Sequence, residues 1–397
     1  MKTPIFYNKY IQIIKEGVFI MKIENPKVTL SDEARNGVKE EVRSGFLDWL
    51  MEFNVEGDDG ELYALGGSIL SLALEKMDLV NLCYAKGKGS VKQLRNSIYK
   101  LAKYPGTVMN EFYRNPQGTL QIEKRENSVL VTCTEHYKVE CFDNGTWHLM
   151  LDTCDGEYKA DLYHRAHGFP LWYGREKPSL LTQHSITYGY NWSGDVDGTI
   201  WLNGKEIKVK GTGQRERYVA VDSSAAELGG WEDWGYITFN EIHSSMYDMR
   251  LGMKDYSVYD LETEKHYTSN GNLKGGDRDT AEMEITHEDW AFLRELDGFV
   301  PSYYNIKIKT EDGVYEAKAH VCNARVWGVT FQTPDNPVAT LIFDRVEGTF
   351  TNNDGTVRTL TGGRGTMSVR QWHQYPNMLP RELYCDDERT GEKFETL

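Results

Sequence analysis

The residues best suited to chemistry form a short polar run, Gln-Arg-Glu-Arg-Tyr, from Gln214 to Tyr218. A carboxyl group kept away from water holds its proton more tightly than usual and can then act as an acid. Aromatic side chains beside it can stabilise positive charge on a substrate. The run follows a segment of alternating apolar residues, so we expect it to lie on a barrel strand that carries polar groups into an otherwise apolar interior.

A tight hairpin leads into this polar run. The pair Asn203-Gly204 separates two alternating segments, 200–202 and 207–209. Both central residues of a two-residue hairpin turn need positive φ, which asparagine and glycine adopt most readily. The sequence therefore predicts two paired strands, the second of which continues into the polar run.

Composition limits the classes of fold and function. The chain has 397 residues, of which 40% are hydrophobic and 26% are charged, and its formal net charge is −15. The length allows two domains or one large all-β unit. The acidic charge argues against a nucleic-acid partner, because phosphate binding needs clustered lysine and arginine. No run approaches the roughly 18 apolar residues of a membrane span, so we expect no integral membrane segment.

The chain is rich in aromatic residues, with 24 tyrosines and 10 tryptophans. Two interpretations stay open. These residues favour β-strands, and they also line cavities that hold flat, apolar ligands.

The six cysteines indicate a reducing compartment. No pair has the C-x-x-C spacing, and a chain of this length does not need disulfides to fold. The first residues lack a clear signal peptide, and Met1 and Met21 are both acceptable starts. We expect a cytoplasmic protein whose thiols are mostly buried and free.

Short strands separated by turns dominate the rest of the chain. Turn sequences occur at 58–60 (Asp-Asp-Gly) and 143–145 (Asp-Asn-Gly), with alternating segments on both sides. Regularly spaced short strands of this kind predict a barrel or a sandwich. Further strands are predicted at 235–250, 255–261, 303–310, 313–322, 325–331 and 338–344.

A few short helices are predicted among the strands. The first covers 30–46 and has Ser31 as its N-cap. Apolar residues at helical spacing predict a second helix over 90–103, packed on the core with a solvated basic face. Thr286 and Asp289 form a capping-box pattern, which predicts the start of a third helix.

A weak internal repeat suggests two related units. GTIWLNGKEIKVKGTGQRERY starts at Gly198, and GTFTNNDGTVRTLTGGRGTMSVRQW starts at Gly348. Each has Gly-Thr, a strand, an Asn-Gly or Asp-Gly turn, a return strand and a glycine-rich close. Common turn chemistry could produce the same pattern by chance. We favour two consecutive β-barrel domains, at 30–229 and 230–397, after an N-terminal extension at 1–29.

Three segments resemble signatures of the carotenoid 1,2-hydratase (hydroxyneurosporene synthase) family. Residues 48–69, DWLMEFNVEGDDGELYALGGSI, match its N-terminal signature of an acidic residue, a tryptophan, an Asp-Gly turn and a tyrosine. The V-x-G-x-G signature is matched at 209–213. A later tryptophan-rich signature is matched by Trp231, Trp234 and Gly235.

The resemblance implies an all-β fold of two consecutive lipocalin-like antiparallel β-barrels, with an active pocket where they meet. The wider group includes kievitone hydratase-like proteins and fungal Diels–Alder cyclases. It implies a large hydrophobic substrate and no metal or organic cofactor, and it leaves a homodimer open. One departure matters for the reaction: the family's Asp-His pair is replaced by Glu216-Arg217.

Hydration or isomerisation of an alkene requires an acid that protonates carbon and a surface that stabilises the cation. A cyclase needs only a shaped cavity and one or two hydrogen bonds. The catalytic candidates nearest the signatures are Glu216, Asp233, His243, Tyr247 and Asp248. The substrate-binding candidates are Arg215, Arg217, Tyr218, Trp231, Trp234 and Tyr188. Each also fits a structural role, such as a salt bridge for Glu216 between its two arginine neighbours.

Two other functions stay open, a non-catalytic carrier of a hydrophobic ligand and a carbohydrate-binding sandwich with an open aromatic groove. His164 and His167 form an H-x-x-H pattern with no third ligand on a recognisable element, so we expect no metal site.

Overall fold

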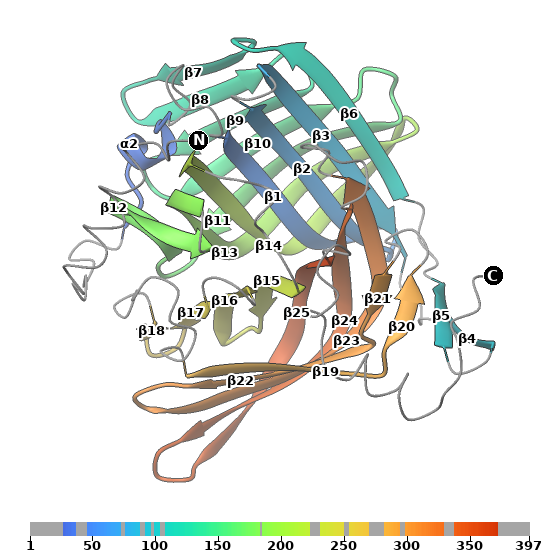
Figure 1. The fold of residues 1–397 in the computed structure, drawn as a ribbon, viewed down its shortest axis with the longest axis vertical. Coiled ribbons are helices and arrows are strands. Elements are labelled where there is room, and N and C mark those ends of the chain that lie inside the picture. The colour runs from blue at the N-terminus through green and yellow to red at the C-terminus, as the bar shows by residue number, and fades with distance from the viewer. Residues whose placement is uncertain are drawn as a thin grey trace, which may run out of the picture.

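The computed structural model describes residues 27–36, 46–72, 76–87, 92–96, 99–103, 108–182, 185–222, 231–249, 254–269, 282–293, 298–328 and 337–371. Figure 1 shows two large curled sheets, an upper one and a lower one. Neighbouring strands within each are antiparallel. The predicted all-β class, with two lipocalin-like antiparallel barrels, is confirmed in the form of these two barrel-like sheets.

The upper sheet in Figure 1, here called the first sheet, runs in the order β6-β3-β2-β1-β14-β13-β11-β10-β9-β8-β7, with β12 paired to β13. Its strands are β1 (Phe46–Gly57), β2 (Leu62–Leu72), β3 (Met77–Lys86), β6 (Val108–Pro116), β7 (Leu120–Lys124), β8 (Ser128–Cys133), β9 (Tyr137–Phe142), β10 (Thr146–Asp152), β11 (Tyr158–Ala166), β12 (Leu171–Thr182), β13 (Ser185–Leu202) and β14 (Lys205–Asp222).

The lower or second sheet runs in the order β18-β17-β16-β15-β25-β24-β23-β22-β19. Its strands are β15 (Trp231–Thr238), β16 (Ile242–Met249), β17 (Lys254–Asp260), β18 (His266–Thr268), β19 (Met283–Glu288), β22 (Tyr303–Lys309), β23 (Gly313–Gly328), β24 (Pro337–Asn352) and β25 (Val357–Gln371). A small third sheet joins both halves of the chain through β4 (Lys92–Asn96), β5 (Tyr99–Lys103), β20 (Ala291–Leu293) and β21 (Gly298–Val300).

The sequence repeat corresponds to equivalent hairpins in the two large sheets. The first copy forms the β13–β14 hairpin, and the second forms β24–β25. In each sheet the second strand of the hairpin also pairs with the sheet's first strand in chain order, β1 or β15. The repeat is therefore a real feature of the fold. That residues 30–229 and 230–397 form two separate domains stays a proposal.

The predicted turn of the first hairpin is confirmed. Leu202 pairs with Lys205, and the two residues between them have positive φ, 50° at Asn203 and 77° at Gly204. A two-residue turn with positive φ at both centres follows the right-handed twist of the paired strands. The turns predicted at 58–60 and 143–145 also join paired strands.

The first predicted helix is much shorter in the described residues. Helix α2 covers Leu30–Glu33, and its N-cap is Thr29 rather than Ser31. The Thr29 hydroxyl accepts from the Asp32 amide, and the Asp32 carboxylate accepts from the Thr29 amide at 2.9 Å. This reciprocal capping fixes the start of the helix two residues earlier than the serine would. Residues 37–45 of the prediction lie outside the described part of the chain.

The predicted helix over 90–103 is wrong, because its described residues form the hairpin β4–β5. Leu94 pairs with Leu101, and Leu101 also pairs in parallel with Phe292 of β20. Apolar residues seven apart fit two turns of a helix, and they also fit opposite positions of a hairpin. The pairing of β5 with β20 favours the hairpin over the helix, because tertiary contacts of this kind override a short periodic signal.

The helix predicted at Thr286 is also wrong. Residues Met283–Glu288 form β19, in which Thr286 pairs with Asn305 of β22. More buried and exposed residues alternate along this strand, as expected because successive side chains of a strand point to opposite faces. Asp289 has a φ of 60°, in the left-handed region, which is incompatible with the first turn of a right-handed helix.

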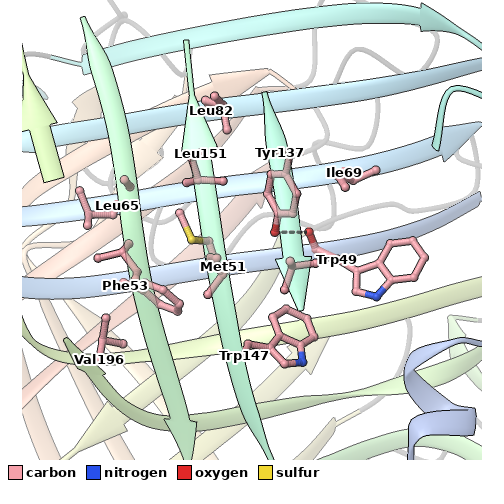
Figure 2. Packing of buried hydrophobic residues seen from close by; sticks show 14 of the residues in the cluster. Trp49, Met51, Phe53, Leu65, Ile69, Leu82, Tyr137, Trp147, Leu151 and Val196 are labelled. Carbon is pink, nitrogen blue, oxygen red and sulfur yellow. Dashed lines mark hydrogen bonds between the residues drawn. The ribbon is translucent and has the colours of Figure 1, made fainter. Parts of the chain in front are cut away.

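Each large sheet buries one face in its own apolar core. The core of the first sheet includes Trp49, Met51 and Phe53, which alternate along β1. Figure 2 shows part of this core, with the Tyr137 hydroxyl donating to the Trp49 carbonyl oxygen at 3.0 Å. The core of the second sheet includes Ile237 of β15. Because side chains alternate along a strand, the residues between these must lie on the other face.

Those other faces meet along a surface that we call the seam. Part of it is apolar, where Leu62, Ala64 and Ala85 of the first sheet pack with Cys322 and Ile342 of the second. Other described contacts across it are polar. They include the bonds from the Asn54 amide to the Phe343 and Gly365 carbonyl oxygens, from Tyr236 to the Thr212 carbonyl oxygen, and from Thr238 to the Thr212 hydroxyl.

A buried ion pair lies in the middle of the seam. Glu52 of β1 accepts from Arg325 of β23 at 2.8 Å, and it also accepts from the Thr340 and Ser368 hydroxyls at 3.0 and 3.1 Å. Burial raises the pKa of Glu52, and the Arg325 charge opposes that rise. A Cβ at Gly66 would lie 2.1 Å from the guanidinium of Arg325, so glycine is needed beside it.

The described cysteines confirm the prediction of mostly buried free thiols, since four of them are buried, Cys154 is exposed and none forms a disulfide. Among the described residues, no helix has the length and apolar character needed to cross a membrane.

The ion pair makes the seam sensitive to the loss of one partner. Arg325→Met should lower the free energy of unfolding by about 3–5 kcal/mol, because it leaves the Glu52 carboxylate buried without a cation. The double variant Glu52→Gln/Arg325→Met should recover most of this loss. Urea unfolding measures both. Lys318→Met, which breaks an exposed pair with Glu288 at 2.8 Å, is the control and should change little. A double variant no more stable than Arg325→Met would contradict this account.

Candidate active site at the seam

A tyrosine of the second sheet reaches a carboxyl group of the first across the seam. The Tyr247 hydroxyl on β16 donates to Glu216 of β14 at 2.5 Å, and both side chains are buried. These were two of the catalytic candidates predicted from the sequence, and the structure brings them together. A short hydrogen bond between a buried phenol and a carboxyl group is a path along which a proton can be held or passed.

A second carboxyl group, missed as a candidate by the sequence, belongs to Asp48. It accepts from the Tyr218 amide at 3.1 Å and is 5% exposed. Burial raises its pKa well above the usual range, and the charge of Glu216 raises it further, while Arg217 opposes the rise. Two carboxyl groups close together in a dry site cannot both ionise easily. We call Asp48, Glu216 and Tyr247 the acid cluster.

A third buried carboxyl group lies beside the cluster. Asp255 of β17 pairs in register with Tyr247, which places both on the same face of the second sheet. Burial raises the pKa of Asp255 well above its usual range. On the other neighbouring strand, Trp234 pairs with Tyr247 and is buried as well. Strands of the second sheet therefore surround the phenol with an acid and an indole.

Two fully buried amide side chains flank Glu216 on the first sheet. Asn191 pairs with Glu216 across β13 and β14, and Gln214 lies two residues before it on the same strand face. Neither side chain is measurably exposed, and among the described residues none of their amide atoms has a hydrogen-bond partner. Unsatisfied buried amides are costly and call for an explanation. Polar groups of a bound molecule would satisfy them.

An apolar surface continues from the acid cluster on the same face of the first sheet. Asp48 pairs with Leu70 of β2, and Leu70 pairs with Leu79 of β3, so the three side chains form one row. Leu70 and Leu79 pack together with Leu72 in a buried cluster. Leu50, in register with Glu216, is also buried. An acid next to aliphatic side chains is the setting that acid chemistry on a hydrocarbon requires.

The two arginines predicted to bind substrate lie on the opposite face of β14. The Arg217 guanidinium stacks on the Trp49 ring, 3.7 Å from its centroid, and donates to the Asp48 carbonyl oxygen at 2.8 Å. Arg215 lies between the rings of Trp147 and Trp192, at 4.7 and 4.9 Å. Both guanidinium groups are therefore parts of the first sheet's interior, away from Glu216.

The other predicted residues are divided between the seam and the cores. Asp233 lies inside the second sheet, where it accepts from Tyr304 at 3.1 Å and contacts His287 at 2.9 Å. Asp248 pairs with Asp233 in register and is partly buried. Tyr188 packs against the first core, with the Arg35 guanidinium over its ring.

The remaining candidates include residues of the seam face. Tyr218 pairs with Asp48 in register, on the face that carries the acid cluster. His243 is on the same strand as Tyr247 but four residues away, roughly 13 Å along the strand. The side chain of Trp231 lies outside the described part of the structure.

Comparison with solved structures identifies the fold. No family model matches the sequence, and no curated protein sequence matches it. A Nitrosomonas europaea protein described as AttH superposes with a TM-score of 0.52 and 11% identity, over 87% of this chain and 98% of its own. Kievitone hydratase of Nectria haematococca gives 0.50 and 10%, over 89% and 98%. The chain has the fold of these two proteins. The resemblance predicted from the signatures is thus confirmed for the fold.

A depression of about 660 Å³ lies away from the acid cluster, on the second sheet. Its lining includes exposed charged residues such as Lys307, Glu316 and Glu347. No aromatic side chain of the described residues lines it, so it is not the open aromatic groove that a carbohydrate-binding sandwich would use.

The raised pKa of Asp48 predicts how stability depends on pH. The folded state holds this proton more tightly than the unfolded state, so stability should fall as pH rises from about 4 through the folded pKa. Asp48→Asn should make that fall smaller, by about 1.4 kcal/mol for each unit by which the pKa is raised. Its amide oxygen can still accept from Tyr218. Urea unfolding from pH 4 to pH 9 measures the change, with Asp143→Asn at an exposed turn as the control. If the free energy of unfolding falls with pH by the same slope in the native chain and in Asp48→Asn, the raised pKa of Asp48 is ruled out.

Proposed function

We propose that this chain is a cofactor-independent lyase or isomerase that acts on a hydrophobic, unsaturated small molecule at the seam. The reaction class includes hydration, double-bond isomerisation and cyclisation, and the substrate class includes isoprenoids, polyketides and polyphenols. The observation that carries the proposal is the acid cluster, in which Glu216 accepts from Tyr247 and Asp48 has a raised pKa. A carboxyl group whose pKa is raised keeps its proton to a higher pH and can protonate an alkene carbon.

The proton transfer follows from the cluster's arrangement. Protonated Asp48 gives its proton to one alkene carbon, and the neighbouring carbon becomes a cation. Glu216 then removes a proton from an adjacent carbon, which moves the double bond, or from an attacking water, which completes a hydration. The proton gained by Glu216 returns to Asp48. The two groups are close enough for the charge of Glu216 to raise the pKa of Asp48. Tyr247 holds the Glu216 carboxyl group in place through its hydrogen bond.

The surroundings of the cluster suit such a substrate. The leucine row beside Asp48 can hold a hydrocarbon chain out of water. The indole of Trp234, next to Tyr247 in register, can face a developing cation. The unpartnered amides of Asn191 and Gln214 can bind a carbonyl or hydroxyl group of the substrate. A molecule that is largely apolar and carries one or two oxygens meets all three requirements.

The fold supports this reaction class without choosing a substrate. One of the proteins that shares it is named a hydratase. The free thiols of the described residues suit a reducing compartment, and a cytoplasmic location is part of this proposal.

Removal of the Glu216 charge tests the proposal. Glu216→Gln keeps an oxygen that can accept from Tyr247, so binding should persist, while turnover should fall by about 10²–10⁴-fold. We would incubate the purified chain with terpenoid, polyene and prenylated phenol alkenes in deuterium oxide. Mass spectrometry of recovered compounds reads isomerisation or hydration as incorporation of deuterium at carbon. Asp78→Asn, at a buried carboxylate bonded to Ser71, Gly118 and Leu120, is the matched control and should keep its turnover.

Two outcomes would overturn the enzyme proposal. Deuterium incorporation that is equal in the native chain and in Glu216→Gln would exclude the acid cluster. Binding of an alkene by the native chain with no incorporation and no new product would favour a non-catalytic carrier, which the same seam could also form. Quenching of the fluorescence of Trp234 by the bound alkene measures that binding independently of turnover.

The same cluster sets the pH dependence of activity. Asp48 must be protonated and Glu216 ionised, so kcat/KM should be bell-shaped: it should rise as Glu216 ionises and fall as pH rises through the raised pKa of Asp48. A rate profile from pH 5 to pH 10 with the best substrate measures this. Asp48→Asn should be nearly inactive throughout. An unchanged profile in Asp48→Asn would assign the acid to another group.

A further inference from the structure

Three side chains with metal-binding atoms meet at the end of the seam away from the acid cluster. They are His167 from the segment between β11 and β12, Asp195 of β13 and His243 of β16. One ligand atom of each lies within 4.8 Å of the other two. The first two residues belong to the first sheet, and the third belongs to the second. The group is therefore assembled only when the sheets pack together.

The backbone and neighbours of His167 fix its position. Its amide donates to the Ser193 carbonyl oxygen at 3.1 Å, and its own carbonyl oxygen accepts from the Trp192 indole at 2.8 Å. The next residue, Gly168, has a φ of 63°, and a Cβ there would lie 2.3 Å from the Tyr259 ring of the second sheet. The loop is thus held by β13 on one side and pressed on the second sheet on the other.

The electrostatic state of the group suits a cation. His167 contacts Asp195 at 2.8 Å, and the His167 and His243 rings lie 4.8 Å apart at 81°. His243 is 4% exposed, and among the described residues its Nδ1 has no hydrogen-bond partner. A neutral imidazole is the form that binds metals.

We propose that His167, Asp195 and His243 bind one divalent transition metal ion, and that this ion clamps the first sheet to the second. Two imidazoles and one carboxylate are a donor set that suits Zn²⁺. Ligand atoms around tetrahedral zinc lie roughly 3.3 Å apart, so a small contraction of the group would complete the site. His167 and Asp195 are partly open to solvent, at 32% and 54% exposed, which gives the ion a path of entry.

The structure separates this group from ordinary histidine–carboxylate pairs. His148 contacts Asp161 at 2.7 Å, and His320 contacts Asp344 at 3.0 Å, and in the described part of the chain neither pair belongs to a group of three. The structure also places the two histidines of the H-x-x-H pattern in different surroundings. His164 stacks on Phe53 in the first sheet and contacts the Gly213 carbonyl oxygen, so it cannot share a metal ion with His167.

Zinc binding to the full-length chain tests the site. Glu135, His136 and Cys154 form a second, exposed group of metal-binding atoms, so every protein would carry Cys154→Ser. After dialysis against a chelator, titration calorimetry with Zn²⁺ should find one site in this parent. Asp195→Asn and His243→Asn should each weaken binding by about tenfold or more. His148→Asn, which breaks a comparable pair, is the matched control and should bind like the parent.

Thermal melting and Co²⁺ substitution separate a clamp from surface binding. Zinc should raise the Tm of the parent and of His148→Asn, and it should not raise that of Asp195→Asn. Cobalt in the parent should give the visible absorption of a low-coordinate site. Absence of zinc binding by the parent, or equal affinity in Asp195→Asn, would overturn the site. Because Asp195 is half exposed, that variant should fold even if His243→Asn does not. Binding without a rise in Tm would overturn the clamp.

Discussion

The ion pair between Glu52 and Arg325 is the interaction on which the arrangement of the two sheets depends. Burying two charges is favourable only when nearly all their hydrogen bonds are made, and the Thr340 and Ser368 hydroxyls complete the set around the carboxylate. Gly66 has no Cβ and so leaves room for the Arg325 guanidinium. The pair therefore holds β23 of the second sheet against β1 of the first. The hydrogen bond from Tyr247 to Glu216 is a second buried contact between the same two sheets.

A seam of this kind conflicts with the usual rule for packed sheets, which bury apolar faces against each other. Here the buried faces carry carboxyl, hydroxyl and amide groups, and the amides of Asn191 and Gln214 have no partner among the described residues. Breaks in local consistency are expected at functional sites. The polar faces make the seam a weak source of folding energy. The apolar cores within each sheet provide most of the stability instead.

Much of the fold could be predicted from local chemistry, and most of the site could not. The Asn203-Gly204 turn and the repeated hairpin depend on neighbouring residues, so sequence was enough. The helix predicted over 90–103 failed because pairing with β20 is not visible locally. The alternation of side chains along a strand does show from sequence alone that residues 215 and 217 cannot share a face with Glu216. That Asp48 joins Glu216 depends on strand order, which brings together residues 168 positions apart in the chain.

The two halves also show why the acid and the aromatic surface come from different sheets. Gly213 pairs with Phe53 of β1, and the equivalent Gly365 pairs with Ile237 of β15. Counted from these anchors, the Asp48-Trp49 dipeptide in β1 and the Asp233-Trp234 dipeptide in β15 are offset by one residue. A shift of one residue exchanges the two faces of a strand. In β1 the tryptophan therefore enters the core and the aspartate faces the seam, whereas in β15 the aspartate enters the core and the tryptophan faces the seam. A repeat that had kept its register would have placed two acids, or two indoles, at the seam, and the offset provides one of each.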